Sequence, residues 1–240
     1  MRFSRVFLLT LAATSAGVAQ AEPIRIMDGI LTPTVTVASD YVFRGISQND
    51  ENITPMIGST WAHKSGVHVD LFAAPVNFRT ANDDANAEID AGVGYTHAFS
   101  NKLTGDASIV AYLYPGSNSN ADYNYFEGIG SLTYDWGVAS TTGLVAYSPD
   151  FTGVGTDEAV FVEGSAAAPF SIKGYDFKAV GGLARQMVDN GLDYTTWRVG
   201  VSYNLMGFTV AATYHDTDIE KSQCDDICGA RGVLSVAYTF

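Results

Sequence analysis

One stretch near the C-terminus decides the fold: residues 197–215 read WRVGVSYNLMGFTVAATYH. From Val199 onward it contains no Asp, Glu, Lys or Arg, so a membrane-spanning helix is the first alternative. However, Asn204 and Gly207 interrupt it, and its residues alternate in character on both sides of the interruption. A period of two is the pattern of a β-strand with two different faces. The stretch therefore predicts two strands joined by a tight turn.

The same period recurs along most of the chain, for example in residues 67–74, 88–96 and 106–113. Helical spacing is not sustained anywhere after residue 21. The residues that repeat are Val, Thr, Tyr, Phe and Gly, which favour strands or disfavour helices. The sequence therefore predicts an all-β protein of about twelve strands. The expected strands are 34–44, 55–63, 66–76, 87–98, 102–114, 123–134, 137–148, 158–168, 170–184, 194–204, 207–216 and 230–240.

The connections between these strands alternate between long and short. Residues 45–54 and 77–86 form long connections, whereas residues 63–66 and 99–101 form short ones. Tight turns on one side and long loops on the other are typical of an up-and-down, antiparallel, transmembrane β-barrel. Both termini would then lie on the tight-turn side, which is the periplasm. A secreted β-sandwich is the alternative, and it explains this rhythm less well.

Composition excludes two other classes of protein. The 240 residues include 26 Asp and Glu against 13 Lys and Arg, for a net charge of −13. Only 16% of the residues are charged and 12% are aromatic, which excludes a disordered chain. Basic residues are too few to neutralise a phosphate backbone, so no nucleic-acid partner is expected.

The N-terminus predicts export. Residues 1–21 combine two basic residues, Arg2 and Arg5, with a short apolar core and the small residues Ala19 and Ala21. This is the pattern of a secretory signal peptide cleaved between Ala21 and Glu22. We expect residues 22–33 to form a short periplasmic segment and residues 34–240 to form the barrel. The predicted location is the Gram-negative outer membrane.

Charged residues within the strands are expected to face the lumen, because a charge facing lipid is costly. Seven acids against four bases predict a cation bias. Asp40 and Arg44 are four residues apart, so both would face inward, about 13 Å from one another. The alternative is that the charges pair and fill a narrow interior. The expected lumen residues are Asp40, Arg44, Asp70, Glu88, Asp90, Lys102, Asp106, Glu127, Glu163, Lys178 and Arg198.

Cysteines and histidines indicate no metal site and no cofactor. Cys224 and Cys228 are the two cysteines of the chain. A zinc site needs about four ligands, so a disulfide that closes a small loop is the favoured interpretation. The four histidines form no metal-binding motif, and no catalytic motif occurs, so we expect no enzyme.

A family resemblance begins at residues 39–48, SDYVFRGISQ. Together with Glu127, the run Tyr147–Asp150 and Thr217-Asp218, this segment resembles the TorF family of porin-like proteobacterial proteins. The resemblance implies an outer-membrane barrel and a channel, without naming a solute. The chain also ends like the signal that the outer-membrane assembly machinery recognises, although an ordinary edge strand is the alternative. That ending consists of Leu234, Val236, Tyr238 and Phe240.

The predicted function is passive diffusion of small hydrophilic solutes through an outer-membrane porin. The expected partners are outer-membrane lipid, lipopolysaccharide, the assembly machinery and an unidentified solute. A closed barrel with a structural or surface-receptor role is the alternative.

Overall fold

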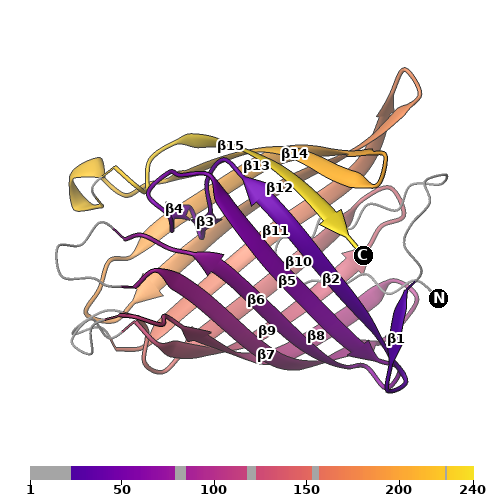
Figure 1. Ribbon diagram of the computed structural model, residues 1–240, viewed down its shortest axis with the longest axis horizontal. Coiled ribbons are helices and arrows are strands. Elements are labelled where there is room, and N and C mark those ends of the chain that lie inside the picture. The colour runs from indigo at the N-terminus through magenta and orange to yellow at the C-terminus, as the bar shows by residue number, and fades with distance from the viewer. Residues whose placement is uncertain (1–22, 79–84, 118–122, 153–156, 225) are drawn as a thin grey trace.

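The computed structural model describes residues 23–78, 85–117, 123–152, 157–224 and 226–240. These residues form a barrel of long, tilted strands (Figure 1). The strands are β1 (Ile24–Ile26), β2 (Gly29–Ala38), β3 (Val42–Phe43), β4 (Ile46–Ser47), β5 (Thr54–His63), β6 (Val67–Pro75), β7 (Ala87–Ala98), β8 (Leu103–Leu113), β9 (Tyr125–Asp135), β10 (Ser140–Ser148), β11 (Ala159–Ile172), β12 (Tyr175–Val188), β13 (Tyr194–Leu205), β14 (Phe208–Thr217) and β15 (Arg231–Thr239), and η1 (Lys221–Gln223) is a short 3-10 helix.

The barrel is closed. From β5 to β15 each strand pairs antiparallel with the next, and β2 pairs with β5 on one side and β15 on the other. Twelve of the described strands therefore complete the ring, while β1 lies on an edge of β2. Closure pairs the backbone N–H and C=O groups at the strand edges, which a β-structure within lipid requires. The prediction of an up-and-down, twelve-stranded barrel is confirmed.

Strand β1 covers the part of β2 that the last strand does not reach. β15 pairs with residues 34–38 of β2, and Phe240 donates a backbone hydrogen bond to Pro33. Ile24 and Ile26 pair instead with Leu31 and Gly29 at the beginning of β2. The first barrel strand thus begins at Gly29, five residues before its predicted start. Residues 1–22, which include the predicted signal peptide, lie outside the described residues.

The outer face of the wall is apolar. Alternate residues on each strand expose large aliphatic side chains, as expected for contact with lipid. Among the described residues, no helix is both long and apolar enough to cross a membrane. The exposed aliphatic side chains include Val37, Ile57, Leu71, Val93, Ile109, Leu132, Leu183, Val199 and Leu234.

Further predicted boundaries are wrong. The strand predicted at 34–44 ends at Ala38. The residues after it form a second hairpin, in which Arg44 and Gly45 are the tight turn and both have positive φ, 48° and 89°. A two-residue hairpin turn favours this conformation at both positions. The turn predicted at Pro169 lies instead at Lys173-Gly174, where φ is again positive. Pro169 lies inside β11, where it pairs with Lys178 of β12 past the end of the pairing with β10.

Candidate functional site: the barrel interior and its inserted hairpin

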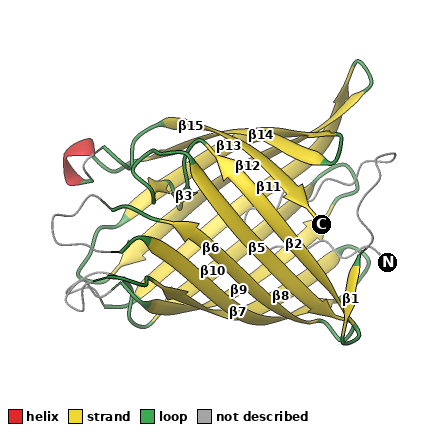
Figure 2. Ribbon diagram, in the orientation of Figure 1, coloured by secondary structure: helices red, strands yellow, loops and turns green. Residues whose placement is uncertain are grey.

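Residues 39–48, which we call the inserted hairpin, fold into the barrel at the end that carries the long loops (Figure 2). Strands β3 and β4 form its two short arms. The ring of Tyr41 lies 5.5 Å from Phe72 on β6, and the ring of Phe43 lies 5.9 Å from Tyr112 on β8. The backbone N–H of Ser47 donates to Ile227, in the loop before β15. The hairpin therefore contacts widely separated parts of the wall.

Arg44, at the tip of this hairpin, reaches the far side of the bore. Its guanidinium donates two hydrogen bonds to the carboxylate of Glu127 on β9, at 2.9 and 2.7 Å, and one to Gln186 on β12, at 2.9 Å. It also lies 4.2 Å from the ring centre of Phe161 on β11. The exposed side-chain fraction is 8% for Arg44 and 1% for Glu127. A paired, bidentate arginine is a strong and geometrically specific contact.

The base of the hairpin is held by a second buried ion pair. Asp40 accepts hydrogen bonds from Ser47, at 2.7 Å, and from Arg231 on β15, at 3.0 Å. Gly45 packs so closely that a Cβ atom there would lie 2.3 Å from Thr196 Oγ1. Any larger residue at this positive-φ position would displace the tip. Asp40 and Arg44 thus lie inside the barrel, but on the hairpin and not on a straight strand as predicted.

Burial of the inward side chains differs between the two ends of the bore. Around the hairpin these side chains are buried, including Tyr112, Tyr125 and Ala146. Toward the tight-turn end, inward hydroxyl side chains are only partly buried. These are Thr60, Thr96, Thr104, Thr133, Thr142 and Ser165. The loop end is therefore packed, whereas the wall at the other end is polar and accessible to solvent.

The interior charges are segregated. The acids Asp70, Glu88, Asp90, Asp106 and Glu127 lie on four successive strands, β6 to β9. Among the described strands, the inward cationic side chains lie across the bore, on β12 to β15, and are Lys178, Arg198 and Arg231. Arg198 is paired with Glu163 on β11, with two hydrogen bonds of 2.7 Å that pass over Gly182 of β12. The bore therefore has an acidic wall and a more basic one.

A histidine links three strands of the acidic wall. The ring nitrogens of His68 lie 2.6 Å from Asp70 and 2.9 Å from Asp106. Thr60 and Thr96 donate further bonds to these carboxylates. The bond to Asp106 crosses β7 at Gly94, where a Cβ atom would lie 2.4 Å from the imidazole. The cluster thus ties β6 to β8 across β7, although Asp106 Oδ1 is buried without a hydrogen-bond partner among the described residues.

Glu88 and Asp90 have no basic side chain among the described residues to pair with. Both are almost fully buried, with exposed fractions of 1% and 2%. Tyr114 donates to one oxygen of Glu88 at 3.0 Å, and the buried Tyr41 of the hairpin lies near this carboxyl. In the described part of the chain, Glu88 Oε2 and Asp90 Oδ1 have no hydrogen-bond partner. Neither carboxyl forms an ion pair with a described residue.

Sequence reasoning also misplaced Lys102, and it missed other interior residues. Lys102 lies exposed in the turn between β7 and β8, because β8 begins only at Leu103. Arg231, at the first position of β15, is an interior cation instead, as its contact with Asp40 shows. Gln186 was also missed, although its even-numbered position on β12 shares the inward face of Lys178.

The disulfide predicted between Cys224 and Cys228 is present. Cys228 is fully buried beside Tyr194 and Ile219, and Ile46 of the inserted hairpin packs against the same cluster. The loop that carries the disulfide thus packs against the inserted hairpin and supports it. Among the described residues, no three His, Cys, Asp or Glu side chains are grouped as a metal site.

The loop end also carries ionised surface acids. Partial desolvation of Asp218 opposes ionisation, but the N–H of Thr195, 2.6 Å away, and the nearby Arg185 together lower the pKa of this carboxyl. It remains negative near neutral pH.

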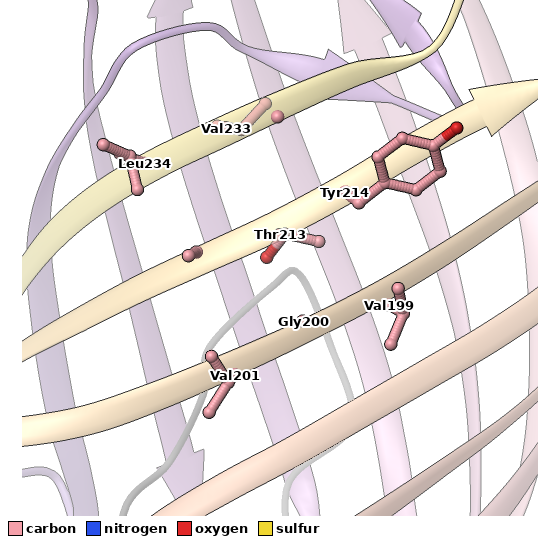
Figure 3. A pocket seen from close by; sticks show the side chains of 9 residues that line it. Val199, Gly200, Val201, Thr213, Tyr214, Val233 and Leu234 are labelled. Atoms are coloured by element: carbon pink, nitrogen blue, oxygen red, sulfur yellow. The ribbon is translucent and has the colours of Figure 1, made fainter.

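A shallow depression on the outer wall offers no comparable chemistry. It lies over β13 to β15, and Figure 3 shows Val199, Val201, Tyr214 and Leu234 around it. These exposed, mainly apolar side chains belong to the lipid-facing surface.

Comparison with solved structures shows the fold. The KdgM porin is 8% identical, with a TM-score of 0.60, and the match covers 87% of this chain and 99% of that one. The NanC porin is 11% identical, with a TM-score of 0.55 and coverages of 87% and 98%. LpxR from Salmonella typhimurium is 10% identical, with a TM-score of 0.52 and coverages of 87% and 99%. At such low identity these likenesses concern the fold alone.

Sequence comparison identifies the family. No curated protein matches the chain. Residues 28–240, which include the whole barrel, match the family described as "Bacterial protein of unknown function (Gcw_chp)". The TorF name stays a prediction. The chain belongs to the Gcw_chp family of bacterial proteins.

Proposed function

We propose that the protein is an outer-membrane channel for small hydrophilic solutes, constricted at its outer end by the inserted hairpin. The observation that carries this proposal is the hairpin itself, which lies inside a closed barrel and is tied across the bore by the contact between Arg44 and Glu127. The partly exposed hydroxyl side chains beyond it provide a polar wall that a hydrated solute would tolerate. The apolar outer face and the porins among the structural neighbours support the same function.

The segregated charges give this channel a preference for cations. Acids outnumber bases among the inward side chains, and Glu88 and Asp90 have no cationic partner in the described chain. A narrow bore with walls of low dielectric constant concentrates the field of such charges. Small cations should therefore enter more readily than small anions.

The proposed partners follow from the proposed location. The outer face contacts phospholipid and lipopolysaccharide, and the assembly machinery recognises the exposed C-terminal strand. Leu234 and Phe240 expose 66% and 48% of their surface, as recognition of this strand requires. Export depends on residues 1–21, with cleavage after Ala21.

The experiment is permeation in reconstituted membranes. Liposome swelling with neutral and charged solutes measures passage, and reversal potential in a salt gradient measures selectivity. We expect a small conductance and a cation preference that declines at high salt, because the Debye length falls to about 3 Å at 1 M. Anion preference would contradict the assignment of the acidic wall.

A closed barrel with a structural or surface-receptor role is the second candidate. The packing of Tyr112 and Phe161 around the hairpin favours it, since these side chains and Tyr41 of the hairpin are buried at the loop end of the bore. Absence of permeation both in the native protein and in a variant that releases the hairpin would support this role. A non-enzymatic function is part of both proposals.

A further inference from the structure

We infer that Glu88 and Asp90 form a weak binding site for a small inorganic cation at the level of the inserted hairpin. The inference rests on the proposed channel function, and it specifies where a permeating cation pauses.

The first argument is electrostatic. Two carboxyl groups lie side by side on β7, two residues apart and thus on one face of the strand, about 7 Å between Cα atoms. Each has a buried oxygen without a hydrogen-bond partner among the described residues, Glu88 Oε2 and Asp90 Oδ1. Burial of a carboxylate without compensation is costly. A cation between the two groups supplies the missing charge.

The second argument concerns the kind of cation. The available ligands are all oxygen atoms, from the two carboxyl groups, from the hydroxyl group of Tyr114, which donates to Glu88, and from that of Tyr41 nearby. Oxygen ligands favour hard cations such as Na⁺ or Ca²⁺ over softer transition metals. Two carboxylates are fewer than a tightly held structural metal requires, in agreement with the absence of a three-ligand group among the described residues.

The third argument is position. Asp90 lies one inward position from Gly92, which pairs with Asp70 of the adjacent strand, so the site continues the acidic wall toward the tight-turn end. Tyr41 belongs to the inserted hairpin, so the site also lies at the level where the hairpin packs inside the bore. A conducting pore needs sites that bind an ion favourably but release it. This pair meets both requirements.

The experiment uses Tb³⁺ as the probe, because tyrosine side chains near the carboxyl groups can sensitise its luminescence. The folded native protein in detergent should show a saturable signal that Ca²⁺ reverses. The double substitution Glu88→Gln and Asp90→Asn should weaken Tb³⁺ binding at least about tenfold, since both charged ligands are removed. The double substitution Asp157→Asn and Glu158→Gln, at an exposed pair of acids beside a long loop, is the matched control and should leave this component unchanged.

The outcomes separate the site from the channel. If the double variant at Glu88 and Asp90 binds Tb³⁺ as the native protein does, the site is refuted, whether or not the barrel conducts. If Tb³⁺ binding depends on the pair but no variant conducts, the site stands and the channel function fails. The single substitutions Glu88→Gln and Asp90→Asn repeat the test should the double variant not fold, which the mobility of unboiled protein on gels will show. The inference is also overturned if the folded native protein binds neither Tb³⁺, Ca²⁺ nor Na⁺ and the pair takes up protons only.

Discussion

Substitution of Arg44 by Ala should release the inserted hairpin. It removes the three hydrogen bonds to Glu127 and Gln186 and the contact with Phe161, and it leaves Glu127, only 1% exposed, without its cation. Loss of one partner of a buried ion pair costs about 3–5 kcal/mol. Because about 1.4 kcal/mol corresponds to a factor of ten, the ratio of seated to released hairpin should fall by about 10²–10⁴.

The assay is single-channel recording in planar bilayers, with liposome swelling as a second measure. We expect Arg44→Ala to raise conductance or the time spent open. Arg198→Ala is the matched control, because it also removes an arginine bound to a glutamate, but its side chain is 32% exposed and does not contact the hairpin. The Arg198 pair is more accessible to solvent than the Arg44 pair, with exposed fractions of 32% and 11% against 8% and 1%, so its loss should cost less and change conductance less.

A second substitution tests the physical cause. In the Arg44→Ala background, Glu127→Gln removes the uncompensated charge, so it should partly restore the closed state. Equal conductance for the native protein and folded Arg44→Ala would refute the role of this contact. An effect of Arg198→Ala as large as that of Arg44→Ala would show that any lost arginine opens the barrel.

The remaining predictions concern folding and assembly. Gly94→Ala should destabilise the barrel by about 1–3 kcal/mol, because its Cβ would lie 2.4 Å from a buried imidazole. Gly130→Ala is the control and should not destabilise it, because a Cβ there would have no atom within 4 Å. The temperature at which unboiled protein loses its folded gel mobility measures the stability of both variants. Native protein should resist thiol labelling until reduction, and replacement of Cys224 and Cys228 by Ser should leave the barrel folded; two reactive thiols in unreduced protein would contradict the disulfide. Deletion of Phe240 should lower the amount assembled in the outer membrane while export continues, and unchanged assembly would count against a C-terminal signal.

Local pattern predicted most of the wall. A strand with one face toward lipid and the other toward the bore must alternate, so residues 87–98 and 207–216 were identified within a residue or so of β7 and β14. The lengths of the connections then gave the topology, because tight turns join only antiparallel neighbours. The prediction that Lys102 faces the lumen failed because alternation does not reveal that this residue lies in a turn, one residue before β8.

Only the tertiary structure placed the inserted hairpin. Tyr41 and Phe43 continue the alternation of the first strand, and nothing local distinguishes a strand from a hairpin with the same period. The contacts that hold the hairpin join residues far apart in the chain, with 83 positions between Arg44 and Glu127 and 191 between Asp40 and Arg231. The sequence alone thus determined the strands, their faces and their order, because these follow from neighbouring residues. Closure of the barrel decided which charges meet across the bore, because only closure brings opposite walls within reach of one side chain. It also decided which charges, such as that of Asp90, find no partner among the described residues.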